Sequence, residues 1–110
     1  MTVRYSGREL TVNGACVVTE EPIADAFEIG DIVIVLIDAP AVIKHGQFQN
    51  LLAFDRLGRR LWTADLPTTN TGDTYYAIGS RDPLVALSTQ SFDCEIDTTT
   101  GHIMRKTFTK

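Results

Sequence analysis

Few side chains in this sequence of 110 residues combine the residue types and the spacing that chemistry requires, and His45 is the foremost of them. It stands between Lys44 and Gly46 in a polar stretch, where an imidazole could contact a ligand or exchange a proton near neutral pH. A histidine in a loop is more often simply solvated. His102 directly follows Gly101, and there we expect a turn histidine that faces water.

Tyr75 and Tyr76 are the best aromatic candidates for contact with a ligand or a partner. Successive side chains of a strand point to opposite faces, so two adjacent tyrosines do not both enter one core. Together with Phe54 and Trp62 they could form an aromatic platform, although aromatic residues in strands more often pack in a core or in cross-strand pairs. We take His45, Tyr75 and Tyr76 as the candidate contact residues.

The remaining residues suggest no nucleophile and no metal site. Ser80, Ser88 and Ser91 lie outside the Gly-x-Ser-x-Gly pattern of a nucleophile elbow. Neither Cys16 nor Cys94 has a second ligand at zinc-finger spacing. The aspartates stand at the ends of apolar runs, where a carboxylate ordinarily caps a turn; they are Asp31, Asp38, Asp55, Asp65, Asp73, Asp93 and Asp97. We expect no catalytic residue, no metal and no cofactor.

Charge and hydropathy narrow the class of partner. The formal net charge of -4 means that a nucleic-acid backbone is repelled by the average field of the protein. The longest apolar run, residues 32–37, is far shorter than a membrane span, and residues 1–7 lack the apolar region of a secretory signal. We therefore expect a cytoplasmic protein with no nucleic-acid or membrane partner, in which both cysteines remain free thiols.

The strongest local pattern is a strand, a tight turn and a strand in residues 51–62. Asp55 and Gly58 lie in that turn. The pattern recurs in weaker form about forty residues later, where Asp97 and Gly101 take the matching places with one residue inserted. Because glycine accepts the positive φ that such turns require, both stretches are predicted to be β-hairpins.

The rest of the chain also has the pattern of short strands. Residues 32–37 are an unbroken, mostly β-branched run that suits a central strand covered on both faces. Residues 39–50 are predicted to be a long polar loop with a turn of helix at 41–44, and residues 23–27 either a loop or one helical turn. We expect one all-β domain over residues 1–110, with about nine or ten short antiparallel strands in meanders. The expected core is Ile32, Ile34, Leu36, Leu52, Phe54, Leu61, Ile78, Leu84, Val85, Leu87 and Ile96.

The ten residues Ala-Phe-Asp-Arg-Leu-Gly-Arg-Arg-Leu-Trp, which begin at Ala53, resemble the blade repeat of quinoprotein-type (PQQ-like) β-propellers. That repeat reads Ala-x-Asp-x-x-Thr-Gly-Lys-x-x-Trp. Ala53, Asp55, Gly58 and Trp62 take its positions, with one turn residue missing. In that family the Asp and the Gly shape the turn and the Trp packs between blades.

The second copy of the pattern keeps Asp97, Thr100 and Gly101 but has Arg105 where the tryptophan should be. The resemblance, which covers residues 50–110, implies blade-like meanders and no particular ligand. A closed propeller needs at least about four blades, so 110 residues cannot close one alone. The quinone cofactor of that family lies at the axis of a closed ring, and we therefore expect none here.

Two arrangements of the meanders remain open: they pack face to face as a sandwich-like domain, or copies of the chain associate. In the first, the edge strands need protection, and cationic residues near the chain ends are candidate guards; these are Arg4, Arg8, Lys106 and Lys110.

These observations favour a small non-enzymatic all-β interaction module that binds a protein partner, or another copy of itself, through a sheet face or edge. The alternative is a small-molecule binding or catalytic domain, with a pocket between sheets that is covered by the Lys44-His45-Gly46 loop. A pocket lined by Tyr75 or Tyr76 and closed by that loop would favour this alternative.

Overall fold

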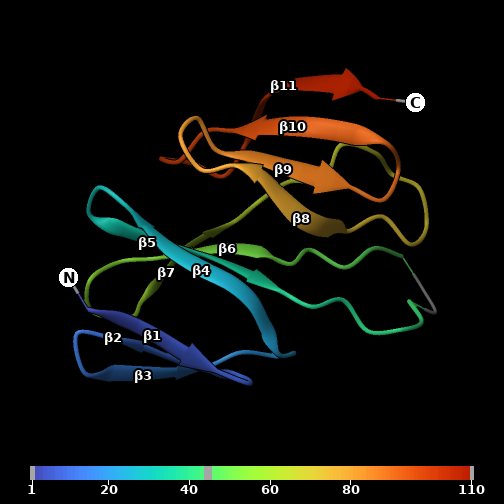
Figure 1. Cartoon of the computed structure of the whole chain (residues 1–110). Coiled ribbons are helices and arrows are strands. Elements are labelled where there is room, and N and C mark those ends of the chain that lie inside the picture. The colour runs from blue at the N-terminus through green and yellow to red at the C-terminus, as the bar shows by residue number, and fades with distance from the viewer. Residues whose placement is uncertain (1, 44–45, 110) are drawn as a thin grey trace.

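The computed structural model describes residues 2–43 and 46–109 of the chain, and these residues form eleven strands (Figure 1). In chain order the strands are β1 (Val3–Ser6), β2 (Glu9–Val12), β3 (Ala15–Val18), β4 (Ile23–Ile29), β5 (Ile32–Ile37), β6 (Leu51–Phe54), β7 (Arg60–Thr63), β8 (Tyr75–Ser80), β9 (Val85–Ser88), β10 (Phe92–Ile96) and β11 (Ile103–Phe108).

The strands make three open antiparallel meanders, each built from strands that are consecutive in the sequence. The N-terminal sheet contains β1–β3, the middle sheet β4–β7 and the C-terminal sheet β8–β11. Figure 1 shows them one above the other in chain order, from the blue strands at the bottom to the red strand at the top. The all-β fold class is thus confirmed, with three sheets rather than two.

The middle sheet is covered on both faces, and its sequence explains why. Val33, Val35 and Ile37 of β5 pack in the core shared with the N-terminal sheet, whereas Ile34 and Leu36 pack in the core shared with the C-terminal sheet. β6 divides its four buried side chains in the same alternating way. A strand that is covered on both faces needs apolar residues at every position, as predicted for residues 32–37.

The two predicted hairpins form and have the same turn construction. Asp55 Oδ1 accepts the backbone N–H of Leu57 at 2.8 Å, and Asp97 Oδ1 accepts that of Thr99 at the same distance. Gly58 and Gly101 close these turns with φ of +78° and +80°. The extra residue of the second turn therefore lies between the aspartate and the glycine.

Each turn is covered by a side chain of the preceding sheet. The indole of Trp62 on β7 lies against Gly101, so close that a Cβ there would stand 2.7 Å from Trp62 Cε3. Its Nε1–H donates to the carbonyl of Thr98 in the same turn, at 2.9 Å. Val17 on β3 lies against Gly58 in the corresponding way, with its Cγ2 at 3.1 Å from the position of a Cβ.

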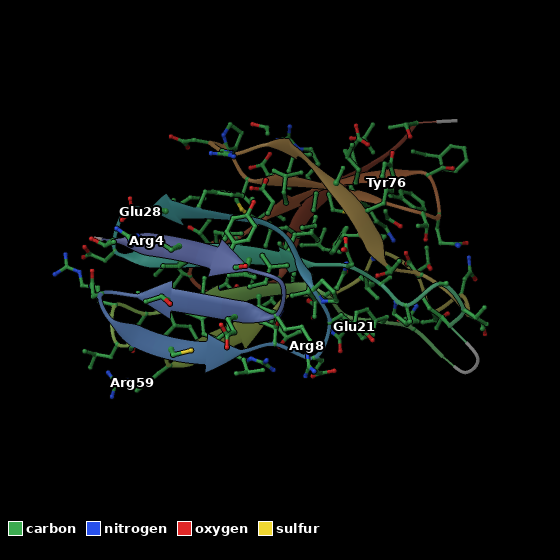
Figure 2. All side chains as sticks on the ribbon, turned by 60° about the horizontal axis from the view of Figure 1, so that its bottom comes forward. Arg4, Arg8, Glu21, Glu28, Arg59 and Tyr76 are labelled. Carbon is green, nitrogen blue, oxygen red and sulfur yellow. The ribbon has the colours of Figure 1, made fainter. Side chains whose placement is uncertain are left out.

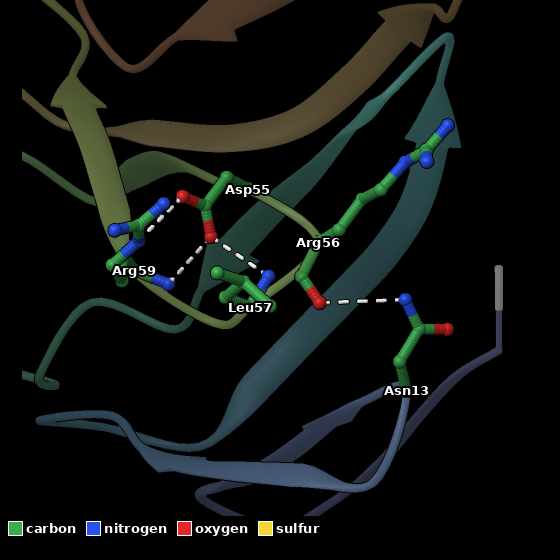
Figure 3. A network of polar contacts seen from close by, with 5 residues as sticks. All are labelled: Asn13, Asp55, Arg56, Leu57 and Arg59. Atoms are coloured by element: carbon green, nitrogen blue, oxygen red, sulfur yellow. Dashed lines mark hydrogen bonds and ion pairs between the residues drawn. The ribbon is translucent and has the colours of Figure 1, made fainter.

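A polar contact accompanies the packing of Val17 on Gly58. Asn13 Nδ2, in the turn between β2 and β3, donates to the carbonyl of Arg56 at 3.3 Å (Figure 3). The same figure shows Asp55 accepting from Leu57 and Arg59, which holds the turn that Asn13 approaches. The β2–β3 turn of the N-terminal sheet is therefore joined to the β6–β7 turn of the middle sheet.

Some expectations are wrong. Residues 23–27 are neither a loop nor a helical turn but the start of β4. The described residues between β5 and β6 contain no helical turn at 41–43. Leu61 is 49% exposed, because its neighbour Trp62 takes the inward-facing position of β7.

The two cysteines lie on different sheets, with the free thiol of Cys16 exposed and that of Cys94 buried. No helix in the described part is long and apolar enough to cross a membrane.

Candidate functional site

A pocket of about 460 Å³ lies beside the first strand of the C-terminal sheet. It is lined by the end of β5, by the chain that leaves β5 as far as Ile43, and by Thr74, Tyr75 and Tyr76 at the start of β8. Polar and apolar atoms share the exposed wall almost evenly, and Asp38, Thr74 and Thr89 are among its polar members. Both tyrosines that the sequence analysis named as candidates, Tyr75 and Tyr76, line this pocket.

The two tyrosines play different parts in this pocket. Tyr75 is buried, whereas the side chain of Tyr76 is 62% exposed. Figure 2 shows Tyr76 beside the C-terminal sheet, well separated from Arg4 and Arg8 of the N-terminal sheet. A molecule that entered the pocket would therefore meet the Tyr76 ring while Tyr75 forms part of the wall.

Tyr75 is held by Asn50, which is completely buried between the middle and C-terminal sheets. The Asn50 side-chain amide donates to the carbonyls of Ile37 and Tyr75 at 2.8 and 2.7 Å, and its oxygen accepts the N–H of Tyr75 at 3.0 Å. One side chain thus joins the end of β5 to the start of β8. This junction fixes the floor of the pocket.

The phenol of Tyr75 is already engaged. Its hydroxyl donates to the carbonyl of Asp65 at 2.7 Å. Burial raises the pKa of Tyr75 well above its usual value, and the neighbouring Cys94 and Asp73 raise it further. Burial also raises the pKa of the Cys94 thiol. Both groups are therefore neutral at physiological pH and suit packing better than nucleophilic or acid–base work.

A second buried polar group stands just before β8. Asp73 is completely buried, and its two carboxylate oxygens accept from the hydroxyls of Ser88 at 2.5 Å and Thr68 at 2.7 Å. The backbone N–H of Thr68 adds a further contact at 3.2 Å. No histidine or lysine is among these partners within the described part, so the group resembles a turn support rather than a proton relay.

His45 and Lys44 lie outside the described residues. Of the described residues that precede them, Ala41 and Ile43 line the pocket. His102 is exposed, as expected for a turn, and its Nδ1 lies 2.8 Å from Asp65 Oδ2.

The four aromatic side chains do not form a common platform, and two of them pack in cores, as is more usual for aromatic residues in strands. Phe54 is buried between the N-terminal and middle sheets, and Trp62 is buried between the middle and C-terminal sheets. They therefore lie on opposite faces of the middle sheet and apart from the exposed ring of Tyr76. Among the described residues, no group of three or more His, Cys, Asp or Glu side chains could hold a metal ion.

The sequence reasoning missed the buried polar residues Asn50, Asp73 and Ser88. Asn50 directly precedes the four apolar residues of β6, which is a weak signal for a polar residue that must satisfy backbone groups at a strand end. Asp73 was attributed to an ordinary turn, because its partner Ser88 is fifteen residues away.

Comparison with known proteins places the chain in a family. Residues 1–108 match the model of the domain of unknown function DUF7957, and the chain belongs to that family. No curated protein and no solved structure matches the chain.

Proposed function

We propose that this protein is a small interaction module that binds a protein partner, or its own copy, through an open sheet face. One observation carries the proposal: the stack of sheets stops without a cover. The middle sheet turns Phe27, Ile34 and Trp62 towards the C-terminal sheet, which buries all three. The corresponding face of the C-terminal sheet has no such cover among the described residues.

That uncovered surface, which we call the C-terminal open face, is recognised from strand pairing. Ala86 and Cys94 pair directly and belong to the core, so the residues next to them along each strand point away from it. The C-terminal open face therefore consists of Ala77, Val85, Leu87, Asp93, Glu95, Arg105 and Thr107. It has apolar residues at its centre and charged residues around them, which is the usual composition of a protein contact surface.

The resemblance to quinoprotein-type propeller blades supports the same proposal. Blades of that kind exist by packing on one another, and the contact of Trp62 with the turn at Gly101 is the type of contact the resemblance implies. In a stack of such sheets each face is covered by the next sheet, so the uncovered face of the last sheet is the one on which another molecule can pack. The net charge of -4 favours a protein over a nucleic acid.

The test compares Leu87→Glu with wild type, because a carboxylate at the centre of the face would have to be buried without a partner on binding. Proteins retained by the immobilised wild type are identified, purified and titrated singly. We expect the dissociation constant of a true partner to rise about tenfold or more for Leu87→Glu. Val42→Glu is the control for an added carboxylate, because Val42 is a 68% exposed apolar residue outside this face. Circular dichroism must show that Leu87→Glu is folded, because Leu87 is half-buried. Equal binding by the wild type and both variants would overturn the proposal.

The pocket beside Tyr76 favours a second candidate, the binding of a small molecule between the sheets. Its volume of about 460 Å³ and its mixed polar and apolar wall suit a small ligand that has both apolar surface and hydrogen-bonding groups. Protein-observed NMR with a fragment library would find such a ligand. His45→Ala and Tyr76→Phe should then weaken its binding, whereas His102→Ala should not. Unchanged affinity in the first two variants would count against this candidate.

A further inference from the structure

We propose that Asn13 is a site of spontaneous deamidation, and that its conversion to a carboxylate separates the β2–β3 turn from the middle sheet. This modification is independent of the proposed function, because it changes the chain itself and needs no partner. Asparagine is among the chemically labile residues of proteins, and a following glycine favours its reaction most. Of the three asparagines in the sequence, Asn13 is the one that glycine follows.

The reaction needs only the chain, a base and water. The amide nitrogen of Gly14 loses its proton to the base and attacks Cγ of Asn13. A bond forms between this nitrogen and Cγ, while the bond from Cγ to Nδ2 breaks and the leaving group takes up a proton and departs as ammonia. One water molecule then opens the resulting five-membered succinimide. Opening at Cγ gives aspartate, whereas opening at the backbone carbonyl gives isoaspartate, whose main chain runs through Cβ and Cγ.

The position of Asn13 and Gly14 in the fold leaves them accessible. They form the two-residue turn between β2 and β3, both are exposed, and their φ angles are +48° and +87°. Positive φ at both central residues is the conformation for which Asn-Gly is preferred. Apart from the chain neighbours of Gly14, no described atom lies within 4 Å of the position its Cβ would take. Other glycines also have such open space, but Gly14 is the one that follows an asparagine.

Two contacts hold the Asn13 side chain and slow the reaction. Its Oδ1 accepts the backbone N–H of Thr2 at 2.8 Å, and its Nδ2 donates to the carbonyl of Arg56 at 3.3 Å (Figure 3). Ring closure requires the side chain to leave these partners and the backbone of Asn13 to rotate. Exposed turns open locally at a small cost in free energy. The folded protein should therefore deamidate more slowly than a peptide but at a measurable rate.

The other two asparagines are internal controls. Asn50 is completely buried, is held by three hydrogen bonds and precedes Leu51. Asn70 is exposed, as Asn13 is, but it precedes Thr71, whose branched Cβ hinders approach to its amide nitrogen. A comparison of Asn13 with Asn70 therefore isolates the effect of the following glycine.

Conversion to aspartate removes the contact between two sheets. The Asn13 amide nitrogen that donates to the Arg56 carbonyl becomes an oxygen, so two acceptors then face each other. The Arg56 guanidinium is already paired with Asp31, and Glu28 lines the same hollow as Asn13 and Arg56. The new charge therefore joins two other carboxylates around a guanidinium that already has a partner.

Conversion to isoaspartate disturbs the turn further, because it adds one carbon atom to the main chain. Val12 and Ala15 pair directly on either side of the two-residue turn, whose length fixes its geometry. Val12 is completely buried in the core that the N-terminal and middle sheets share. The added atom is therefore taken up by the turn, which moves away from Arg56.

The first test follows the wild-type protein at neutral pH and physiological temperature by peptide mapping and mass spectrometry, beside a synthetic peptide of residues 10–17. Asn13 should deamidate at a rate within about tenfold of the peptide's, because the turn opens locally. An isoaspartyl methyltransferase should label the product, and the rate should rise with pH because the Gly14 amide must lose its proton. Asn50 and Asn70 should stay intact over the same period.

Two results of this test would overturn the site. If Asn13 stays intact while the peptide reacts completely, the turn protects it. If Asn70 reacts as fast as Asn13, exposure rather than the following glycine decides the rate.

The second test compares Asn13→Asp with Asn70→Asp, which add the same charge to two exposed turns. Asn70 Nδ2 donates to Gln90 Oε1 at 3.2 Å, and the Gln90 amide can turn to donate to a carboxylate, whereas the carbonyl of Arg56 cannot. The urea midpoint of Asn13→Asp should fall below that of the wild type, and that of Asn70→Asp should stay close to it. Aged wild-type protein that contains isoaspartate should have a lower midpoint than Asn13→Asp. Equal midpoints for both variants and the aged protein would contradict the separation of the turn.

Discussion

Gly101 is the residue at which backbone conformation and packing coincide. Its positive φ already disfavours any other residue, and the indole of Trp62 occupies the space of a side chain. Gly14 has nearly the same φ with open space around it. A substitution at each of the two glycines therefore separates the free-energy cost of the backbone conformation from the cost of displacing the indole of Trp62.

Gly101→Ala is expected to lower the free energy of unfolding by about 3 kcal/mol, of which about 1 kcal/mol is backbone strain and the rest the displacement of Trp62. Gly14→Ala should cost about 1 kcal/mol. Urea unfolding of both variants, followed by circular dichroism, measures the difference. Equal losses would mean that the indole moves aside freely and that the contact of Trp62 with Gly101 contributes little.

The buried thiol of Cys94 makes the free energy of unfolding depend on pH in the alkaline range. Burial raises its pKa in the folded state above the value near 8.5 of an unfolded chain. An unfolded chain therefore releases this proton first, so the stabilisation is complete below about pH 8.5 and is lost as the pH rises towards the folded-state pKa. Tyr75 adds a contribution of the same sign above about pH 10.

The free energy of unfolding should consequently fall between about pH 8.5 and pH 10, and the fall should be shallower in Cys94→Ala. Urea titrations at a series of pH values measure the slope. Cys16→Ala, which changes an exposed thiol, should follow the wild-type curve apart from a constant offset. A Cys94→Ala curve parallel to wild type would show that another group causes the alkaline loss.

At the scale of the elements, Asn50 is the joint between the middle and C-terminal sheets. Its three hydrogen bonds connect the end of β5 to the start of β8, and all of them are buried. Removal of this side chain takes away the hydrogen bond that each of two carbonyls and one N–H makes with it away from water. Such groups cost more than the hydrogen bonds themselves contribute.

Asn50→Ala should lower the free energy of unfolding by about 2–4 kcal/mol. The matched control is Gln49→Ala, which removes one bond from an exposed amide to the carbonyl of Ala64 and should cost under about 1 kcal/mol. Denaturant midpoints of both variants make the comparison. If both variants lose the same amount, water replaces Asn50 at the joint.

The sequence predicted the elements that obey local rules. The hairpin turns were predicted because Asp and Gly shape a turn through their own backbone, and β5 was predicted because two covered faces leave no polar position. β4 was missed for a physical reason. Its pairing with β5 shifts between Ile23 and Asp25, and this irregularity disrupts the alternation that identifies a strand.

The candidate site was predictable only in part. Adjacent tyrosines in a strand implied one buried and one exposed ring, and Tyr75 and Tyr76 have those positions. The polar residues that hold Tyr75 depend on partners far away in the sequence. Asn50 binds Tyr75 across 25 residues, and no local pattern encodes such a distance.

On the scale of the whole molecule, the middle sheet belongs to both cores. Loss of either outer sheet uncovers one complete apolar face of it, so neither core is expected to survive without the other. Unfolding should therefore be a single transition, as in most domains of this size. The chain provides a probe for each half: its one tryptophan, Trp62, in one core, and the exposed Cys16 on the N-terminal sheet.

The fluorescence of Trp62 and that of a dye attached to Cys16 should give the same urea midpoint. Cys94 remains unlabelled in the folded protein because it is completely buried. An earlier midpoint for the dye would show that the N-terminal sheet separates first and that the middle sheet tolerates an uncovered face. The dye is attached to the Leu87→Glu protein, so that self-association through the C-terminal open face does not shift either urea midpoint.

The burial of β5 on both faces also limits how its sequence can drift. On most strands every second residue faces water and accepts nearly any replacement, so random substitution erases the apolar pattern while the fold survives. Residues 33–37 of β5 are all buried, and an exchange there must be apolar and of similar volume. In a library of single substitutions selected for folded protein, this stretch should retain the narrowest set of amino acids, whereas β11, with five exposed residues in succession, should accept almost any.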